Sequence, residues 1–329
     1  MLTRRHLIAL AAAQALAPRL SIREGRAQTA KAGFPSKPVR IIVPVAAGGP
    51  TDIVARMLAE KLSRMWGQEV FIENKGGAGT NIGNEYAARS DPDGYTILFA
   101  TTSLAVNTSL YRSLSYDPIA DFAPVSLVTQ LAYFVFVPNS SPARSIKELI
   151  DYARSRPGRL TIASPGTGSA PYLAEMLFLQ MAGIKMTHIP YRGAAPAFAD
   201  LIPGRVDCYF GSGALLSYAR SGQVRVLASS ASARDAAAPD VPTIAEGGVP
   251  GYDVTAWQAL FVPAKTPPAI VRKISVDTNA ALADPATRDK LAATGYAAEG
   301  SSPEELEKLF RSEIAKWGAV IKSLGLRID

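Results

Sequence analysis

The sequence is poor in the residues on which most metal sites and many enzymes depend. It has one cysteine, Cys208, and two histidines, His6 and His188. A single cysteine cannot form an internal disulfide, so the folded chain must be held together by its hydrophobic cores. The sequence has no Cys/His metal cluster, no Gly-x-Ser-x-Gly nucleophile elbow and no Walker loop. We therefore expect a protein without metal, cofactor or catalytic residues.

Both Cys208 and His188 have a plain structural explanation. Cys208 lies in an apolar strand segment, where a small buried hydrophobe is a better interpretation than a reactive thiol. His188 alternates with Thr187 and Ile189 in another predicted strand. We interpret it as a structural histidine rather than a general base.

The apolar segment 7–17 is too short to span a bilayer. It is interrupted by Gln14 and closed by Pro18, whereas a spanning helix needs about 20 apolar residues. Arg4 and Arg5 precede it and small residues follow, which is the layout of a secretion signal. We predict that residues 1–30 are an export signal and that the protein is periplasmic. Residues 3–8 resemble a twin-arginine signal, and an ordinary Sec signal remains the alternative.

Much of the positive charge belongs to this leader. Residues 1–30 contain five basic residues and one acidic residue, so their removal lowers the net charge from +7 to +3. The remaining basic residues are scattered and form no stripe with interleaved aromatic residues. We expect no nucleic-acid partner.

The remaining chain is long enough for two domains, and its first part alternates strand-like and helix-like segments. Strands are predicted at 39–45, 70–73 and 95–100, and helices begin at Asp52 and near Asn81. A βαβαβ order implies a parallel sheet.

A second alternating series begins at Ser145, which has Glu148 at capping-box spacing. The predicted strands of this series are 160–164, 186–190, 206–210 and 224–228, and its later helices are 169–183 and 194–202. Segments 133–137 and 254–262 are apolar strands followed by proline, which we interpret as paired crossings between two lobes. A final helix opens at Ser302 and is expected to pack back on the first lobe.

These patterns predict an α/β fold of two lobes, each a mostly parallel sheet flanked by helices. Lobe 1 comprises residues 36–137 and 256–329, and lobe 2 comprises residues 138–255. Open α/β sheets bind ligands at the carboxyl ends of their strands, so the cleft between the lobes is the expected ligand site.

Glycine-rich corners follow two first-lobe strands, at residues 44–52 and 74–83. Glycine lets backbone N–H groups approach a ligand at a helix N-terminus, an arrangement that suits an anion. Three hydroxyl groups follow the third strand, where they could bind a ligand or cap the helix before Leu104. The first-lobe candidates are Ala46, Ala47, Gly48, Gly49, Thr51, Asp52, Gly76, Gly77, Ala78, Gly79, Thr80, Thr101, Thr102 and Ser103.

The spacing of Gly77, Gly79 and Gly83 imitates a dinucleotide fingerprint. A dinucleotide site also needs an acidic residue at the end of the following strand, to bind the ribose. That strand runs into hydroxyl residues instead, so we do not favour NAD or a flavin.

The second lobe offers a similar corner at residues 164–169. After the strand that ends at Pro190, Tyr191 could form a pocket wall and Arg192 could pair with a carboxylate or lie exposed. Asp207, among apolar neighbours, could receive a ligand donor or hold the adjacent loop. The second-lobe candidates are Ser164, Gly166, Thr167, Gly168, Ser169, Tyr191, Arg192 and Asp207.

From about Pro38 onward the chain resembles the Bug family, the periplasmic receptors of tripartite tricarboxylate transporters. The resemblance depends on six motifs in order, which are Pro-Val-Arg-Ile-Ile-Val-Pro at 38–44, Gly-Gly-Pro-Thr-Asp at 48–52, Glu-Asn-Lys-Gly-Gly-Ala-Gly at 73–79, Asp-Gly-Tyr-Thr at 93–96, Tyr-Arg-Gly at 191–193 and Gly-Arg-Val-Asp at 204–207.

The resemblance implies a type II periplasmic-binding fold that closes by hinge motion. It also implies a ligand carboxylate held by backbone amides and ordered waters from residues 46–52 and 76–80, with 164–169 and the Tyr191 region added by the second lobe. Lys75 precedes Gly-Gly where proline is frequent in the family, and Cys208 and Tyr209 also depart from its usual residues.

The function predicted from these observations is a non-enzymatic, monomeric receptor. It would capture a small organic carboxylate and deliver it to the integral membrane subunits of a tripartite transporter. Two alternatives stay open, which are an exported sensor that carries ligand to a signalling protein and an exported enzyme that acts on a carboxylate.

Overall fold

The computed structural model describes residues 33–167, 169–191 and 194–327. Contacts divide the chain into Met1–Ser36 and Lys37–Asp329, and all elements below belong to the second unit. The predicted export signal, residues 1–30, lies outside the described residues. Within the described part of the chain, no helix combines the length and the apolar character that a membrane crossing requires.

The first-lobe sheet begins with three parallel strands, as the alternating pattern predicted. Strand β1 (Val39–Val43) lies between β2 (Val70–Asn74) and β3 (Thr96–Thr101). Its register places Ile41 beside Ile72 on one side and Ile97 on the other. Helix α2 (Pro50–Trp66) connects β1 to β2. The short turn η1 (Ala78–Thr80) and helix α3 (Asn81–Ala88) connect β2 to β3, and α4 (Ser103–Leu110) follows β3.

Two antiparallel strands extend this sheet. Strand β9 (Thr255–Pro263) pairs with β3, and β4 (Phe122–Pro138) pairs with β9. The two-residue strand β10 (Ala297–Ala298) pairs with β4 as well. The first-lobe sheet is therefore parallel at one end and antiparallel at the end that faces the second lobe.

The second-lobe sheet repeats this plan. Strand β5 (Thr161–Ser164) lies between β6 (Thr187–Pro190) and β7 (Cys208–Ser212), all parallel, and β7 pairs antiparallel with β4. Strand β8 (Val224–Ser229) also pairs antiparallel with β4. The helices of this lobe are α5 (Ile146–Ser155), α6 (Ala170–Ala182), α7 (Ala194–Leu201) and α8 (Leu216–Arg220), with the turn η2 (Gly213–Leu215) before α8.

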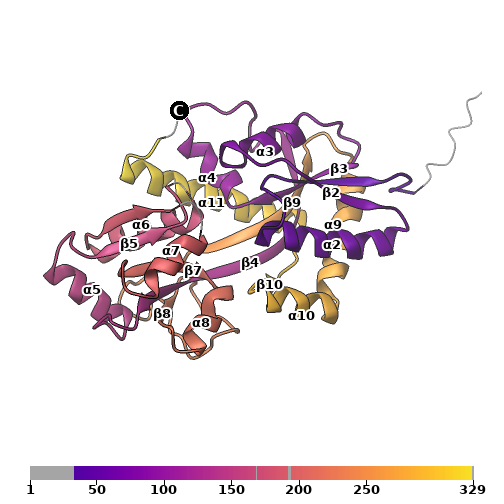
Figure 1. Cartoon of the computed structure of the whole chain (residues 1–329). Helices are drawn as coiled ribbons and strands as arrows, with labels where there is room; N and C mark the ends of the chain where they lie inside the picture. Colours follow the sequence, from indigo (N-terminus) through magenta and orange to yellow (C-terminus); the bar gives the residue numbers. More distant parts are fainter. Residues whose placement is uncertain (1–32, 168, 192–193, 328–329) are drawn as a thin grey trace, which may run out of the picture. The chain divides into compact units, whose positions relative to one another are not determined.

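Strand β4 is common to both sheets and runs through the molecule (Figure 1). Its first part, up to Ala132, pairs with β9, and its second part, from Tyr133, pairs with β7 and β8. The change of partner lies inside the segment that we assigned to lobe 1 by sequence. The expected strand 133–137 is thus only the end of a 17-residue strand. The first part of β4 was not predicted because it contains polar residues. Ser126 and Thr129 can be buried in this strand because they hydrogen-bond to Asn279 and Gln258.

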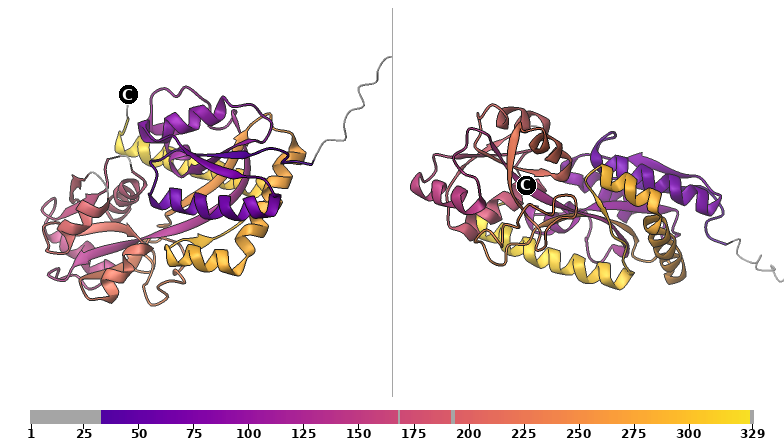
Figure 2. Two further views of the ribbon diagram at one scale, coloured as in Figure 1. Left: turned by 45° about the vertical axis from the view of Figure 1, so that its right-hand side comes forward. Right: turned by 90° about the horizontal axis from the view of Figure 1, so that it is seen from below.

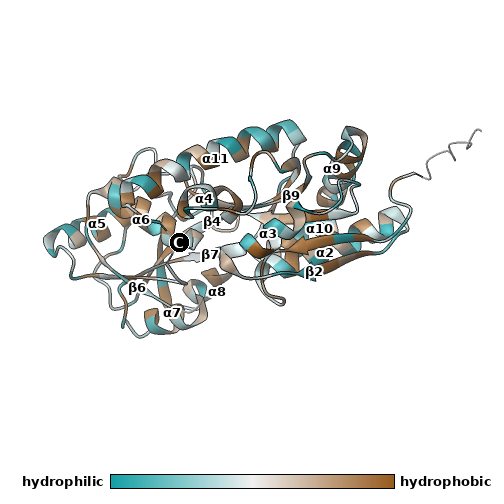
Figure 3. Ribbon diagram, turned by 90° about the horizontal axis from the view of Figure 1, so that it is seen from above, coloured by the Kyte–Doolittle hydropathy of each residue, from teal (hydrophilic) through white to brown (hydrophobic). Residues whose placement is uncertain are grey.

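Helix α11 (Pro303–Leu324) closes the first lobe, as predicted. Ser302 and Glu305 form its capping box, and the buried side chains Phe310 and Trp317 face the core. The helix lies along α4 (yellow in Figures 1 and 2), with polar residues on its outer side (Figure 3). Helices α9 (Pro268–Ala283) and α10 (Pro285–Ala293) precede it.

Hydrophobic packing on both faces of the second-lobe sheet explains its strand pattern. Phe210, Cys208 and Val135 belong to the large core that also contains α6 and α11 residues. Tyr209 and Phe136 belong to a separate core under α7. Cys208 is fully buried, as its structural interpretation required. Each large buried side chain contributes about 1.5–3 kcal/mol to stability, so the two cores can stabilise the fold without a disulfide.

Candidate functional site

A cleft of about 270 Å³ lies between the two lobes, above the point where β4 changes partners. Its floor is formed by Leu131, Tyr133, Ala256, Trp257 and Gln258 of β4 and β9. Its first-lobe wall includes Thr51, Thr80, Thr101, Thr102 and Ser103, and Ala170 and Ser212 face them from the second lobe. No charged side chain lines the cleft among the residues that the structure describes. The lining therefore offers hydroxyl groups, amides and backbone dipoles as ligand partners.

The first corner, at residues 44–52, is held by Asp52. One carboxylate oxygen accepts from the Gly48 amide at 2.9 Å and from Arg56 Nε at 2.8 Å, and the other accepts from Asn74 Nδ2 at 2.8 Å. Burial alone would raise the pKa of Asp52, but these hydrogen bonds hold it below its ordinary value. Asp52 is 2% exposed, so it fastens the corner and has no free oxygen for a ligand.

The rest of this corner stays accessible. Ala46, Ala47 and Gly48 are exposed, and Gly49 is half-buried at the N-cap of α2. The helix begins at Pro50, two residues earlier than predicted, because proline is favoured in the first turn of a helix. Of the predicted residues in this corner, Thr51 lines the cleft.

The second corner has an unusual backbone. Gly77, Ala78, Gly79 and Thr80 have φ values of 130°, 47°, 60° and 83°. Positive φ costs about 1 kcal/mol or more in a residue that is not glycine, so Ala78 and Thr80 are strained. Such strain persists only where the surroundings impose it, and it concentrates at functional sites.

A polar network imposes this conformation. Asn107 Nδ2 donates to the Gly79 carbonyl at 2.8 Å and to Asn81 Oδ1 at 2.7 Å. Tyr116 donates to Asn81 Oδ1 at 2.8 Å and accepts from Asn84 Nδ2 at 3.0 Å. Burial raises the pKa of Tyr116 to about 12, so its hydroxyl remains a donor at any physiological pH.

Close packing explains the glycine spacing that imitated a dinucleotide fingerprint. A methyl group on Gly83 would lie 2.7 Å from Pro44 Cβ, so glycine lets α3 approach the end of β1. A methyl group on Gly79 would lie 2.6 Å from the Tyr111 hydroxyl. A methyl group on Gly76 would lie 3.1 Å from the Ala46 amide nitrogen, so the first and second corners lie side by side.

The third corner, after β3, is tied to the cleft floor. The Trp257 amide donates to Thr102 Oγ1 at 2.9 Å, and the Thr102 amide donates to the Trp257 carbonyl at 3.1 Å. Gln258 Nε2 donates to Thr51 Oγ1 at 3.2 Å, while the side-chain oxygen of Gln258, Oε1, accepts from the Thr129 hydroxyl. These bonds satisfy the Thr102 hydroxyl, which therefore holds the strand end in place.

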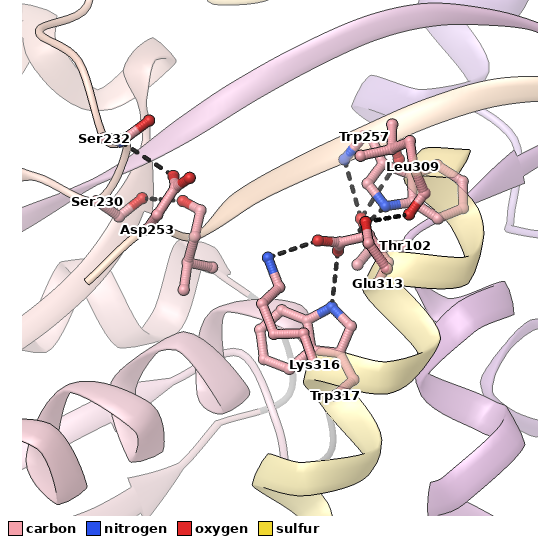
Figure 4. Close-up of polar contacts among 11 residues, drawn as sticks. Thr102, Ser230, Ser232, Asp253, Trp257, Leu309, Glu313, Lys316 and Trp317 are labelled. Atoms are coloured by element: carbon pink, nitrogen blue, oxygen red, sulfur yellow. Dashed lines mark hydrogen bonds and ion pairs between the residues drawn. The ribbon is translucent and has the colours of Figure 1, made fainter. Parts of the chain in front are cut away.

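A buried carboxylate anchors the same tryptophan from below. Figure 4 shows Glu313 of α11 between the indole rings of Trp257 and Trp317. Its Oε2 accepts from Trp317 Nε1 at 2.8 Å and from Trp257 Nε1 at 3.3 Å, and its Oε1 lies 2.5 Å from Lys316 Nζ. The floor of the cleft is thereby fixed to α11.

The second-lobe corner is closed by its own hydrogen bonds. Ser164 Oγ lies 2.7 Å from His188 Nε2 and accepts from the Gly166 amide at 3.2 Å. Ser169 caps α6 by accepting from the Tyr172 amide, and its hydroxyl donates to the Gly166 carbonyl. Thr167 is exposed, and Gly168 lies outside the described residues. None of the described residues of 164–169 lines the cleft, although the adjacent Ala170 does.

Two of the remaining second-lobe candidates, Tyr191 and Asp207, do not line the cleft. Tyr191 donates to Asp200 Oδ2 at 2.8 Å and packs on the core under α7. Asp207 precedes β7, at the strand end opposite the cleft, and accepts from the Thr161 amide and hydroxyl at 2.8 Å each. It has the loop-holding geometry, which was the alternative to a ligand role. Arg192 lies outside the described residues.

Several cleft residues were missed by sequence reasoning. Tyr133 and Trp257 lie in the predicted crossing segments, so the expectation that these strands pass beneath a cleft could have identified them. Ser212, at the end of β7, and Tyr296, after α10, carry no motif. Their neighbours in space come from distant parts of the chain.

A larger groove of about 710 Å³ lies elsewhere, at the outer edge of the first lobe. Its lining includes Arg40, Lys75 and Tyr86, and both cations stack on the Tyr86 ring at 5.0 and 4.0 Å. Glu73 pairs with both cations, so one carboxylate compensates part of their charge. The smaller cleft is the better candidate because strand ends and crossing strands converge on it.

Comparison with known proteins places this geometry in a family. The sequence model of the "Tripartite tricarboxylate transporter family receptor" matches residues 54–326. The chain belongs to the tripartite tricarboxylate receptor family. This membership confirms the resemblance to Bug proteins and the two-lobed α/β fold. A relative, Protein BugT of Bordetella pertussis, is 35% identical over 298 residues, which cover 90% of this chain and 91% of BugT.

Solved structures of this receptor family have the same fold. The R. palustris protein Rpa4515 with adipate has 34% identity and a TM-score of 0.79, with 90% of this chain and 100% of that chain covered. The periplasmic binding protein BugD has 33% identity and a TM-score of 0.75 at the same coverage. MatC of Rhodopseudomonas palustris with bound malate has 33% identity and a TM-score of 0.73, covering 88% and 100%.

Proposed function

We propose that this protein is a periplasmic receptor that captures a small organic carboxylate between its two lobes and delivers it to a tripartite tricarboxylate-type transporter. The observation that carries the proposal is the convergence of three first-lobe strand ends on one interlobe cleft. Related receptors are solved with adipate and with malate, and both ligands are dicarboxylates.

The chemistry of the corners fits a carboxylate. A carboxylate accepts hydrogen bonds only. The corners offer backbone amides and hydroxyl groups, and the floor adds the side-chain amide of Gln258. The strained run from Gly77 to Thr80 is held before any ligand arrives, so little ordering entropy remains to be lost on binding. We propose residues 46–51 and 76–80, together with Thr101 and Ser103, as the first-lobe partners, with Asp52 and Thr102 positioning them.

Two further parts of the proposal rest on family membership and on the leader pattern. We propose that residues 1–30 direct export, by the twin-arginine route or by the Sec route, and that the mature protein acts as a monomer. The membrane subunits of the transporter would be its partner. Deleting residues 1–30 should retain the protein in the cytoplasm, and replacing Arg4 and Arg5 with lysine should block export only if the twin-arginine route is used.

The best candidate for a catalytic nucleophile and base, Ser164 with His188, does not favour the enzyme alternative. Ser164 Oγ and His188 Nε2 are within hydrogen-bonding distance, as a nucleophile and its base would be. Ser164 is fully buried, however, and its oxygen already accepts from the Gly166 amide. A substrate carbonyl could not reach it, so we propose a binding role without turnover.

Titration calorimetry tests the proposal. The panel comprises adipate, malate, benzoate and glutamate, and at least one should bind with a dissociation constant in the micromolar range or below. Recovery of the intact ligand after prolonged incubation excludes turnover. No measurable heat from any of these acids would overturn the proposed ligand class.

A matched pair of variants locates the site. Ala170→Phe adds a ring to the cleft wall at the start of α6, and Ala315→Phe adds the same ring to an exposed position of α11. Binding should be lost in the first variant and kept in the second. If Ala170→Phe binds as well as the original protein, the ligand lies elsewhere, and the 710 Å³ groove becomes the next candidate.

A further inference from the structure

The two lobes touch at a pair of glycines beside the cleft. Gly295 follows α10 in the first lobe and Gly213 opens η2 in the second lobe. A methyl group on Gly295 would lie 2.8 Å from the Ala214 amide nitrogen and 3.2 Å from the Gly213 carbonyl carbon. Two backbones are therefore in contact with no side chain between them.

This contact lies on one edge of β4, level with the change of partners. On that edge β10 pairs with Thr129 and Gln130, and β7 pairs from Tyr133 onward. The glycine pair bridges the gap between these two short stretches. On the opposite edge, β9 and β8 are joined across the same gap by a different device.

That device is Ser230, which is fully buried. Its backbone amide donates to the Tyr133 carbonyl at 2.8 Å, and its hydroxyl accepts from the Tyr133 amide at 2.8 Å. The Val254 amide donates to the Ser230 carbonyl at 2.8 Å, and the Ser230 hydroxyl donates to the Val254 carbonyl at 2.6 Å. Four hydrogen bonds thus hold one edge together, whereas no hydrogen bond joins Gly295 to Gly213 or Ala214 among the described residues.

We propose that Gly213 and Gly295 form a bearing that sets how closely the two lobes approach each other around a ligand. The proposal rests on the receptor function and adds the residues that control closure. A rotation of one lobe against the other keeps the Ser230 edge together and moves the glycine edge. Because glycine has no side chain, the two backbones can shift relative to each other while they stay at van der Waals distance.

The cleft depends on this distance. Ser212 precedes Gly213 and Tyr296 follows Gly295, and both line the cleft from opposite lobes. A side chain in the bearing would separate them without touching the ligand. The closed form would then be less populated, and the apparent affinity falls by the same factor as the closed population.

Gly295→Ala, compared with Gly222→Ala, isolates this effect. Gly295 has φ of 81° and Gly222 has φ of 74°, so alanine is strained to a similar extent at both positions. A methyl group on Gly222 meets nothing within 4 Å, whereas the one on Gly295 meets the Ala214 amide. Any difference between the variants therefore reports the interlobe contact and not the backbone strain.

Calorimetry should show a dissociation constant about tenfold higher in Gly295→Ala than in Gly222→Ala. Small-angle scattering should show less compaction on ligand addition in Gly295→Ala. Equal affinity and equal compaction in the two variants would overturn the bearing. Because the contact does not involve a ligand, a wider envelope of Gly295→Ala without ligand would support the bearing even if no carboxylate bound to the original protein.

Gly213→Val keeps the test decisive if Gly295→Ala does not fold. Gly213 lies outside the left-handed region, and a methyl group there would make only ordinary contacts, 3.5 Å from Phe134 and 3.7 Å from the Gly295 carbonyl. The two methyl groups of valine reach further toward Gly295 and should weaken binding in the same way. Unchanged affinity in this variant would also overturn the proposal.

Discussion

Replacing Glu175 with methionine should stabilise the protein, because this carboxyl group is buried with little compensation. Glu175 lies on α6, is fully buried, and neither of its oxygens has a hydrogen-bond partner among the described residues. Burial raises its pKa well above the ordinary value of 4.5, and the neighbouring Phe210 amide offsets only part of this effect. Tyr133, Tyr252 and Cys208 surround it without offering a positive charge.

The magnitude follows from the cost of an unsatisfied buried group. Leaving a buried polar group without a partner costs about 1–3 kcal/mol, and methionine has a similar volume without the polar atoms. Methionine at position 175 should therefore raise the free energy of unfolding by about 1–3 kcal/mol. Each kcal/mol shifts Tm by about 2–4 °C in a chain of this size, which scanning calorimetry resolves.

The dependence of stability on pH tests the same prediction. A raised pKa in the folded state means that folded Glu175 keeps a proton that the unfolded chain releases above about pH 4.5. Its contribution to stability is therefore complete below that pH and decreases as pH rises toward the folded pKa. Glu175→Met should gain more stability at pH 8 than at pH 4. A destabilised methionine variant, or an equal gain at both pH values, would refute the claim that burial of this carboxyl is poorly compensated.

Three other substitutions test the supports of the cleft. Asn107→Ala removes the donor that holds the Gly79 carbonyl, so it should weaken carboxylate binding by about tenfold in calorimetry and lower stability by about 1–3 kcal/mol. Glu313→Gln removes the carboxylate charge beneath Trp257 and replaces one acceptor oxygen with an NH2 donor, so it should cost about 1–3 kcal/mol in chemical unfolding and shift the Trp257 fluorescence. Ser302→Ala removes a helix cap far from the cleft, so Tm should fall by the equivalent of about 1 kcal/mol while the affinity stays unchanged.

Local chemistry made much of the fold predictable. The capping residues Ser145 and Ser302 and the extent of the helix at 169–183 were predicted correctly, because caps involve residues within one helical turn. The structure ends that helix at Gly183 in a left-handed conformation. Alternation of strands and helices identified both parallel sheets for the same reason, since each βα unit is contiguous in sequence.

The candidate site was predictable only in part. Glycine and hydroxyl residues marked the three first-lobe corners, and Thr51, Thr80 and Thr101 of those corners line the cleft. Their role in binding stays a prediction. Asp52 looked like a ligand residue from its position in the corner, but its carboxylate is taken up by Arg56, one turn later on the same helix, and by Asn74 from the end of β2.

The sequence by itself determined the alternation of strands and helices in each lobe, several helix caps and the positions of the glycine-rich corners, because these follow from interactions between near neighbours in the chain. Only the tertiary structure decided that β4 serves both sheets, that Ser230 staples one of its edges and that Gly213 meets Gly295 on the other. These features bring together residues that are distant in sequence, since Ser230 bonds to Tyr133, 97 positions away, and Gly213 meets Gly295, 82 positions away. The glycine contact requires no particular side-chain motif.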